Sequence, residues 1–203
     1  MHKFLKRIYQ LIWKPIWWFK KSIKLYFNFI FPNLNFLISK RVTFISKPTC
    51  NQKTLLTGLG HIHIGDKCTL GYKPGGFHRG GSIELQARYK KSNIKIGNKV
   101  ATNNNIFICA ANVIEIGDNT LIGQNVTIMD FEAHGLDPTK RNEIGEIGDV
   151  VLGGNIWIGN NVTILKNTKI GANSIVAAGA VVSGKFPSNV VIGGIPAKII
   201  KDI

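Results

Sequence analysis

His134 is the residue of this sequence whose type and surroundings suit it best for chemistry. It stands in a stretch that reads Asp-Phe-Glu-Ala-His-Gly-Leu-Asp-Pro-Thr-Lys-Arg from residue 130, and no other histidine follows residue 78. Imidazole exchanges protons near neutral pH, so it can take the proton of a hydroxyl or an amine as that group attacks. His134 is therefore a candidate general base, and the alternative is an idle, solvated side chain.

Three carboxylates near His134 could orient its ring. A group that accepts a hydrogen bond from the far nitrogen of a base fixes its tautomer. Glu143 and Glu146 follow His134 in the same stretch, and the sequence does not choose between them. Asp130 is a further candidate for this role.

The body of the chain has to position these groups, and its sequence has a period of six residues. An aliphatic residue at every sixth position, beside a small residue, predicts a coil with three short flat sides that buries its interior against the next coil. The spacing of three to four that an amphipathic helix needs is missing here. We therefore predict an all-β fold, a parallel β-helix. The clearest marks of the repeat are Ile116-Gly117, Ile122-Gly123, Ile128, Ile158-Gly159, Ile164, Ile170-Gly171, Val176-Ala177 and Val182.

The repeat breaks once, between Met129 and Val150. A loop that interrupts a regular solenoid can carry side chains that no core requires. We therefore predict that residues 129–150 form an active-site loop around His134.

Three segments carry a resemblance to a known family: Trp-Ile-Gly-Asn-Asn-Val-Thr-Ile from residue 157, Ile-Gly-Ala-Asn-Ser-Ile-Val-Ala-Ala-Gly-Ala-Val-Val from 170 and Gly-Gly-Ile-Pro-Ala-Lys from 193. Over residues 60–203 the chain resembles the hexapeptide-repeat acyltransferases, above all the galactoside/maltose and polysaccharide O-acetyltransferases. The resemblance implies a left-handed parallel β-helix, acetyl-CoA as acyl donor, and a homotrimer with active sites between subunits. His-Gly-Leu-Asp resembles the family's His-Pro-Leu/Ile-Asp motif, which implies that His134 is catalytic.

The same resemblance implies roles for other residues. Asn103 matches a family asparagine near the acceptor, although it could also belong to a corner of the β-helix. Ala111 and Asn112 stand where the sugar acetyltransferases place an acidic acceptor-binding residue, so the acceptor differs or is bound otherwise. The positions that match CoA-binding residues are Asn160, Ala178 and Ser183 at coil corners, Lys185, Lys198 and Lys201 as basic groups for phosphates, and Trp157, which could also simply fill a corner.

Other functions on this fold are less well supported. A β-helical carbonic anhydrase needs three histidines that converge on zinc, whereas residues 79–203 contain only His134. His61 and His63 lie on one face of a predicted strand, but structural roles are favoured over a metal site, and we expect no metal. A non-catalytic scaffold would be expected to have lost either His134 or the Gly-Ile-Pro-Ala-Lys segment. N-acetylation of an amino sugar stays open beside O-acetylation of a sugar hydroxyl.

The first 49 residues differ in composition from the rest. They contain ten Lys and Arg and no acidic residue, whereas residues 50–203 contain sixteen basic and eleven acidic residues. Basic and apolar positions alternate at helical spacing up to about residue 30, with Trp13, Trp17, Trp18 and Tyr26 added. This pattern is typical of a basic amphipathic helix, with a kink allowed at Pro15, that lies on an anionic membrane surface.

Two alternatives to membrane binding stay open for this helix. Its apolar face could pack on the body or on a partner subunit. A nucleic acid is the least supported partner. Residues 1–49 are thus predicted as an N-terminal helical segment, of which residues 1–40 bind the membrane, and residues 50–203 as the β-helix. The acceptor would be a carbohydrate or a lipid-linked glycan. No CxxC pair is formed by the three cysteines, Cys50, Cys68 and Cys109. The apolar core of a signal peptide would be interrupted by Lys14, Lys20, Lys21 and Lys24. We therefore expect a cytoplasmic location, peripheral on the inner face of the membrane.

Overall fold

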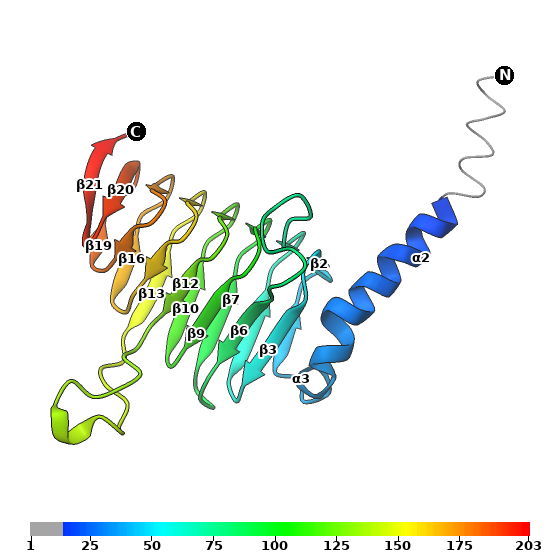
Figure 1. Ribbon diagram of the computed structural model, residues 1–203, viewed down its shortest axis with the longest axis horizontal. Helices are drawn as coiled ribbons and strands as arrows, with labels where there is room; N and C mark the ends of the chain where they lie inside the picture. Colours follow the sequence, from blue (N-terminus) through cyan, green and yellow to red (C-terminus); the bar gives the residue numbers. More distant parts are fainter. Residues whose placement is uncertain (1–13) are drawn as a thin grey trace.

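A computed structural model describes residues 14–203 of the chain, which form a parallel β-helix preceded by a helical segment (Figure 1). Successive strands pass in turn to three sheets, so that each coil adds one strand to each sheet. The first sheet consists of β1 (Val42–Phe44), β4 (His61–Ile64), β7 (Asn93–Ile96), β10 (Val113–Ile116), β13 (Asp149–Leu152), β16 (Thr168–Ile170) and β19 (Lys185–Phe186).

The second and third sheets complete the prism. The second consists of β2 (Thr49–Cys50), β5 (Thr69–Leu70), β8 (Ala101–Thr102), β11 (Leu121–Ile122), β14 (Trp157–Ile158), β17 (Ile175–Val176), β20 (Val190–Gly194) and β21 (Ala197–Asp202). The third consists of β3 (Thr54–Gly58), β6 (Ile83–Ala87), β9 (Phe107–Ala110), β12 (Thr127–Met129), β15 (Thr163–Ile164) and β18 (Val181–Val182). The strands pair in parallel except β21, which runs antiparallel to β20 at the last coil.

The six-residue repeat corresponds to the buried interior of these coils. Ile128 pairs with Ile164, and Ile164 with Val182, so aliphatic side chains stack from coil to coil and are fully buried. Asparagines take the left-handed backbone conformation at many corners, which asparagine tolerates better than most residues. Their side chains continue from coil to coil, as where the Asn125 amide donates to Asn161 Oδ1 at 3.0 Å. The predicted all-β class and β-helix are confirmed.

The N-terminal segment is helical as expected, but it is interrupted. It consists of α2 (Lys14–Leu25), a π-helical turn η2 (Tyr26–Ile30), a 3-10 turn η3 (Phe31–Asn33) and α3 (Leu34–Ile38). The positions predicted before Lys14 lie outside the described residues. The strand β1 lies before residue 50 and β2 begins at Thr49, so the coils begin within the segment predicted as helical.

The end of the helical segment covers the open end of the β-helix. Phe29 and Phe36 are buried in the same core as the coils. Asn33 is buried and serves the edge strand β3, because its amide donates to the Thr54 carbonyl at 2.7 Å and its Oδ1 accepts the Leu56 N–H at 2.6 Å. Without this cover, the aliphatic side chains of the first coil and the unpaired edge of β3 would face water.

The helix α2, which precedes this cover, extends away from the coils (Figure 1). Four apolar side chains at helical spacing are exposed, namely Ile16, Phe19 and Ile23 of α2 and Phe27 of η2. Packing on the body therefore accounts for the end of the segment and not for this face. No helix in residues 14–203 is long and apolar enough to cross a membrane.

Candidate active site

The break in the repeat forms an arm that leaves the β-helix between β12 and β13. Its two sides run antiparallel: the Glu132 N–H donates to the Glu146 carbonyl at 2.9 Å and the Gly135 N–H to the Glu143 carbonyl at 2.8 Å. A 3-10 turn, η4 (Pro138–Lys140), forms the tip. The arm projects from the side of the prism (Figure 1), so its side chains are presented outside the coils.

His134 lies on this arm with its ring oriented by the backbone. Its Nδ1 is 2.7 Å from the carbonyl oxygen of Arg141 across the arm. Because a carbonyl can only accept, this contact requires the proton on Nδ1, and the neutral ring then presents Nε2 as a proton acceptor. This is the tautomer that a general base needs.

The Arg141 carbonyl takes the orienting role that was expected of Glu143, Glu146 or Asp130. In this chain Glu143 contributes its backbone carbonyl to the arm, and the other two carboxylates have different partners. The expectation of a carboxylate partner rested on closeness in sequence. The antiparallel course of the arm instead brings a carbonyl to the imidazole.

Glu146 anchors the arm to the next coil. Its carboxylate forms an ion pair with Lys166 and accepts a hydrogen bond from the Asn167 amide at 3.0 Å, and Lys166 is also 3.2 Å from Glu132. The hydrogen bond from Lys166, then that from Asn167, lowers the pKa of Glu146, and the hydrogen bond to Glu146 raises the pKa of Lys166. The base of the arm is thus held to the turn between β15 and β16.

Asp130 stabilises the corner at which the arm begins. It is buried, and its carboxylate accepts the N–H groups of Ala111 at 2.6 Å and Asn112 at 2.9 Å. Burial raises its pKa, although these backbone hydrogen bonds oppose the shift. The Asp130 carboxylate therefore holds the backbone at Ala111 and Asn112.

A second corner carries three of the other predicted residues. Asn103, Asn160 and Ala178 each follow a strand of the second sheet and precede a strand of the third. A groove of about 300 Å³ on this side is lined by Asn103, Asn160 and Trp157, among others. Trp157 is 57% exposed and so does not fill a buried corner.

This corner is tightly packed. A Cβ added to Gly123 would lie 2.6 Å from Asn160 Oδ1, which also accepts the Gln124 N–H at 2.9 Å. Asn103 Oδ1 accepts the N–H of Asn104 at 2.8 Å. The two asparagines therefore also take part in shaping the corner, as the structural alternative for Asn103 anticipated.

The remaining predicted residues lie elsewhere. Ser183 follows β18 and shares with His134 the corner between the third and first sheets, and Lys185 is exposed on β19. Lys198 and Lys201 are exposed on β21, beside Gly193 and Val191 of β20. Within a single chain, His134 is therefore far from the groove, because Asn103, Trp157 and Asn160 lie at a different corner of the prism.

Sequence reasoning missed two groups of residues. The Lys166 anchor could not be found, because lysine in a repeat is an ordinary surface residue. The second group is a loop between β5 and β6 with three basic side chains, Lys73, His78 and Arg79, marked in the sequence only by glycine pairs in a slip of the repeat. As for metals, residues 14–203 contain no cluster of three or more His, Cys, Asp or Glu side chains, and His63 Nδ1 lies 3.0 Å from Thr43 Oγ1.

Comparison with known proteins places this architecture among the acyltransferases with hexapeptide repeats. The model of the bacterial transferase hexapeptide repeat (six repeats) matches residues 149–184. A protein of Dictyostelium discoideum, provisionally named an acetyltransferase, is 40% identical over 112 residues, which cover 55% of this chain and 58% of that protein.

Solved structures agree. A hexapeptide-repeat-containing acetyltransferase of Vibrio cholerae is 34% identical with a TM-score of 0.51, over 54% of this chain and 62% of that chain. Its complex with acetyl-CoA matches 89% of this chain and 83% of that chain with a TM-score of 0.53 at 24% identity. A galactoside acetyltransferase in complex with coenzyme A is 25% identical with a TM-score of 0.53, over 90% of this chain and 78% of that chain.

The fold class is therefore a left-handed parallel β-helix, as the resemblance implied. The chain is similar to the hexapeptide-repeat transferases, whose repeat model matches residues 149–184. It spans about 58% of the length of the Dictyostelium relative and 62% of the length of the Vibrio chain in the 34%-identical match.

Proposed function

We propose that this chain is an acetyl-CoA-dependent O-acetyltransferase that acts on a sugar hydroxyl in cell-envelope polysaccharide or glycolipid biosynthesis. The observation that carries the proposal is His134, whose Nδ1–H is held by the Arg141 carbonyl on an anchored arm so that Nε2 can accept a proton. The acetyltransferase names of the similar proteins support the donor and the reaction class.

In the proposed reaction, Nε2 of His134 takes the proton of the acceptor hydroxyl as its oxygen attacks the thioester carbon. The tetrahedral intermediate places negative charge on the former carbonyl oxygen, which backbone N–H groups at a coil corner would stabilise. Collapse breaks the carbon–sulfur bond, and the thiolate of CoA receives the proton from the imidazolium. The products are an O-acetyl ester and free CoA.

The active site would be completed by a second subunit. His134 lies at the corner between the third and first sheets, whereas Asn103, Trp157 and Asn160 lie at the corner between the second and third. Adjacent prisms that place these two corners face to face would bring the base to the groove, and three copies close such a ring. We therefore propose a homotrimer, with Ala178 and Ser183 on the pantetheine arm and Lys185, Lys198 and Lys201 available for the phosphates of CoA.

We further propose that α2 docks the enzyme on the cytoplasmic surface of the membrane, where a lipid-linked acceptor would be reached. Phe19 of α2 and Phe27 of the adjoining turn η2 are 67% and 61% exposed, and aromatic side chains of this kind insert at the headgroup boundary. Deleting residues 1–40 would also remove Phe29 and Phe36 from the core. Point substitutions therefore test docking more cleanly.

Flotation with anionic vesicles would compare F19S/F27S with a matched pair of exposed apolar residues on the coils, I45S/L59S. We expect the helix pair to lose vesicle binding and the coil pair to retain it. Equal retention by both pairs would refute docking through α2.

The enzyme activity is tested by thiol release from acetyl-CoA over a panel of hexoses, amino sugars and lipid-linked glycans. The acetylated product, freed of acetyl-CoA, is then treated with alkaline hydroxylamine, which cleaves an oxygen ester and leaves an amide intact. We expect turnover with an ester product. An amide would instead show N-acetylation, and the absence of both turnover and acetyl-CoA binding would refute the proposal.

A further inference from the structure

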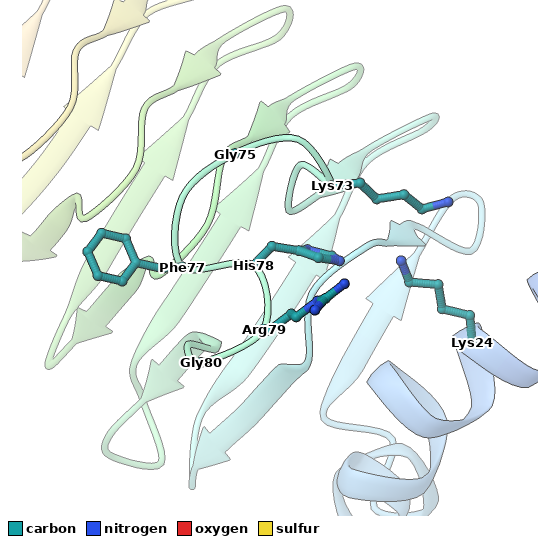
Figure 2. Close-up of a pocket in the computed structure, with 7 residues that line it drawn as sticks. All are labelled: Lys24, Lys73, Gly75, Phe77, His78, Arg79 and Gly80. Carbon is teal, nitrogen blue, oxygen red and sulfur yellow. The ribbon is translucent and has the colours of Figure 1, made fainter.

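Four basic side chains from distant parts of the chain converge on one pocket at the N-terminal end of the β-helix. Lys73, His78 and Arg79 come from the loop between β5 and β6, and Lys24 comes from α2 (Figure 2). The pocket has a volume of about 770 Å³ and its remaining lining residues are Gly75, Phe77 and Gly80. Figure 2 shows the four side chains directed into the space between the loop and the helix.

Within residues 14–203, no ion pair neutralises these basic groups. None of the residues that line the pocket is acidic, and the first acidic residue in the whole sequence is Asp66. The Nδ1 atom of His78 is buried without a hydrogen-bond partner among residues 14–203. Burial, followed by the positive charge of Lys73, lowers the pKa of Lys24. A pocket lined by these basic groups is suited to bind an anion.

The loop that carries three of these groups is held in place by two buried amides. The Asn104 amide donates to the carbonyls of Tyr72 at 2.8 Å and Gly76 at 2.9 Å, and its Oδ1 accepts the Tyr72 N–H at 2.9 Å. The Gln52 amide donates to the Phe77 carbonyl at 2.7 Å. Since both amides are almost fully buried, the basic side chains extend from a fixed backbone rather than from a loose loop.

An apolar pocket of about 520 Å³ adjoins the basic one and shares Lys24 and Lys73 with it. Trp17, Trp18 and Leu25 of α2 contribute to its lining. Basic groups beside an apolar, aromatic surface fit a ligand with a phosphate at one end and a hydrocarbon chain at the other. A free phosphate would use the first pocket alone.

We propose that this pocket binds the phosphate group of a membrane lipid, with the hydrocarbon chain directed along the apolar pocket on α2. Ammonium and guanidinium groups are the usual protein partners of phosphate. Gly75 lines the pocket and also touches the candidate acceptor corner, because a Cβ added to it would lie 2.3 Å from Asn103 Oδ1. A glycan carried on that phosphate would therefore start beside Asn103, an extension that rests on the proposed function.

The test compares two pairs of substitutions with the same change in charge. K73Q/R79Q removes two groups of the pocket, whereas K90Q/K91Q removes two exposed lysines from a different corner, between β6 and β7. Binding of the full-length protein to phosphatidylcholine vesicles containing phosphatidic acid is measured by flotation, without acetyl-CoA or acceptor. Circular dichroism and thermal unfolding confirm that both variants are folded.

Each cation near an anionic bilayer contributes a factor of about five in affinity, so K73Q/R79Q should weaken binding by roughly tenfold or more. K90Q/K91Q should stay within about twofold if those lysines lie away from the membrane. Equal losses in the two pairs would show diffuse attraction and overturn the proposal, as would no loss in either. Inorganic pyrophosphate serves as a soluble competitor that has the phosphate groups but no hydrocarbon chain. If the protein bound it as tightly as it binds the vesicles, the lipid assignment would be overturned.

The outcome is separable from that of the acetyltransferase proposal. Vesicle binding involves no turnover, and thiol release can be measured on soluble acceptors. A protein that transfers acetyl groups but shows no pocket-specific binding would refute this inference alone.

Discussion

Replacing His134 by asparagine would test the general base while leaving the arm in place. The asparagine amide can still donate to the Arg141 carbonyl as Nδ1–H does, but no atom replaces Nε2 as proton acceptor. A positioned general base contributes about 10²- to 10⁴-fold, so kcat should fall by roughly two to four orders of magnitude. At about 1.4 kcal/mol per tenfold, this equals about 3 to 5 kcal/mol of activation free energy.

The assay is thiol release at saturating acetyl-CoA with a responding acceptor, together with calorimetric binding of acetyl-CoA. His134→Ala, which loses both the base and the hydrogen bond, should be no more active than His134→Asn, and its arm should exchange amide hydrogens faster. Lys140→Ala, an exposed residue on the same arm, is the control and should stay near the wild type. A His134→Asn variant that binds acetyl-CoA and keeps more than about a tenth of kcat would show that His134 is not the base.

Further predictions concern the core, the groove and the anchor of the arm. Ile164→Ala removes a fully buried side chain stacked between Ile128 and Val182 and should lower the free energy of unfolding by about 2 to 5 kcal/mol, measured by urea denaturation; a smaller loss would mean that the coil collapses around the gap. Trp157→Ala should raise KM for acetyl-CoA while changing the free energy of unfolding by less than about 0.5 kcal/mol, because the side chain is mostly exposed; a large loss of stability with an unchanged KM would make it a packing residue. The folded pKa of Glu146 lies below its ordinary value of 4.5, so its anchoring of the arm should be present at neutral pH and be lost as pH falls below 4.5. Hydrogen exchange of the arm amides, corrected for intrinsic rates, should show this loss in the wild type. The same pH dependence of exchange in Glu146→Gln would contradict the prediction.

The period of six residues was enough to predict the architecture, because each aliphatic position that it marks must be buried for a coil to be stable. Ile116, Ile122, Ile158 and Val176 are all buried in the stacked core as that argument requires. The break in the period located the arm, since no solenoid coil can contain such a polar stretch. The helical spacing of basic and apolar residues likewise indicated an amphipathic N-terminal helix.

The partners of individual polar groups were decided only by the tertiary structure. A repeat predicts which residues face inward, but it does not say which side chain of a coil meets which side chain of the next, or how an inserted arm folds back on itself. For this reason the Arg141 carbonyl rather than a carboxylate orients His134, and Lys166 anchors the arm.

The same reasoning applies at the N-terminus. Residues 1–49 read as one amphipathic segment, yet the chain buries Phe29 and Phe36 against the first coil and leaves Phe19 and Phe27 exposed. The open end of a β-helix needs a cover, and the end of the helical segment provides it. That docking also brings Lys24 to Lys73, His78 and Arg79, a set of residues about fifty positions apart that no local pattern could have assembled.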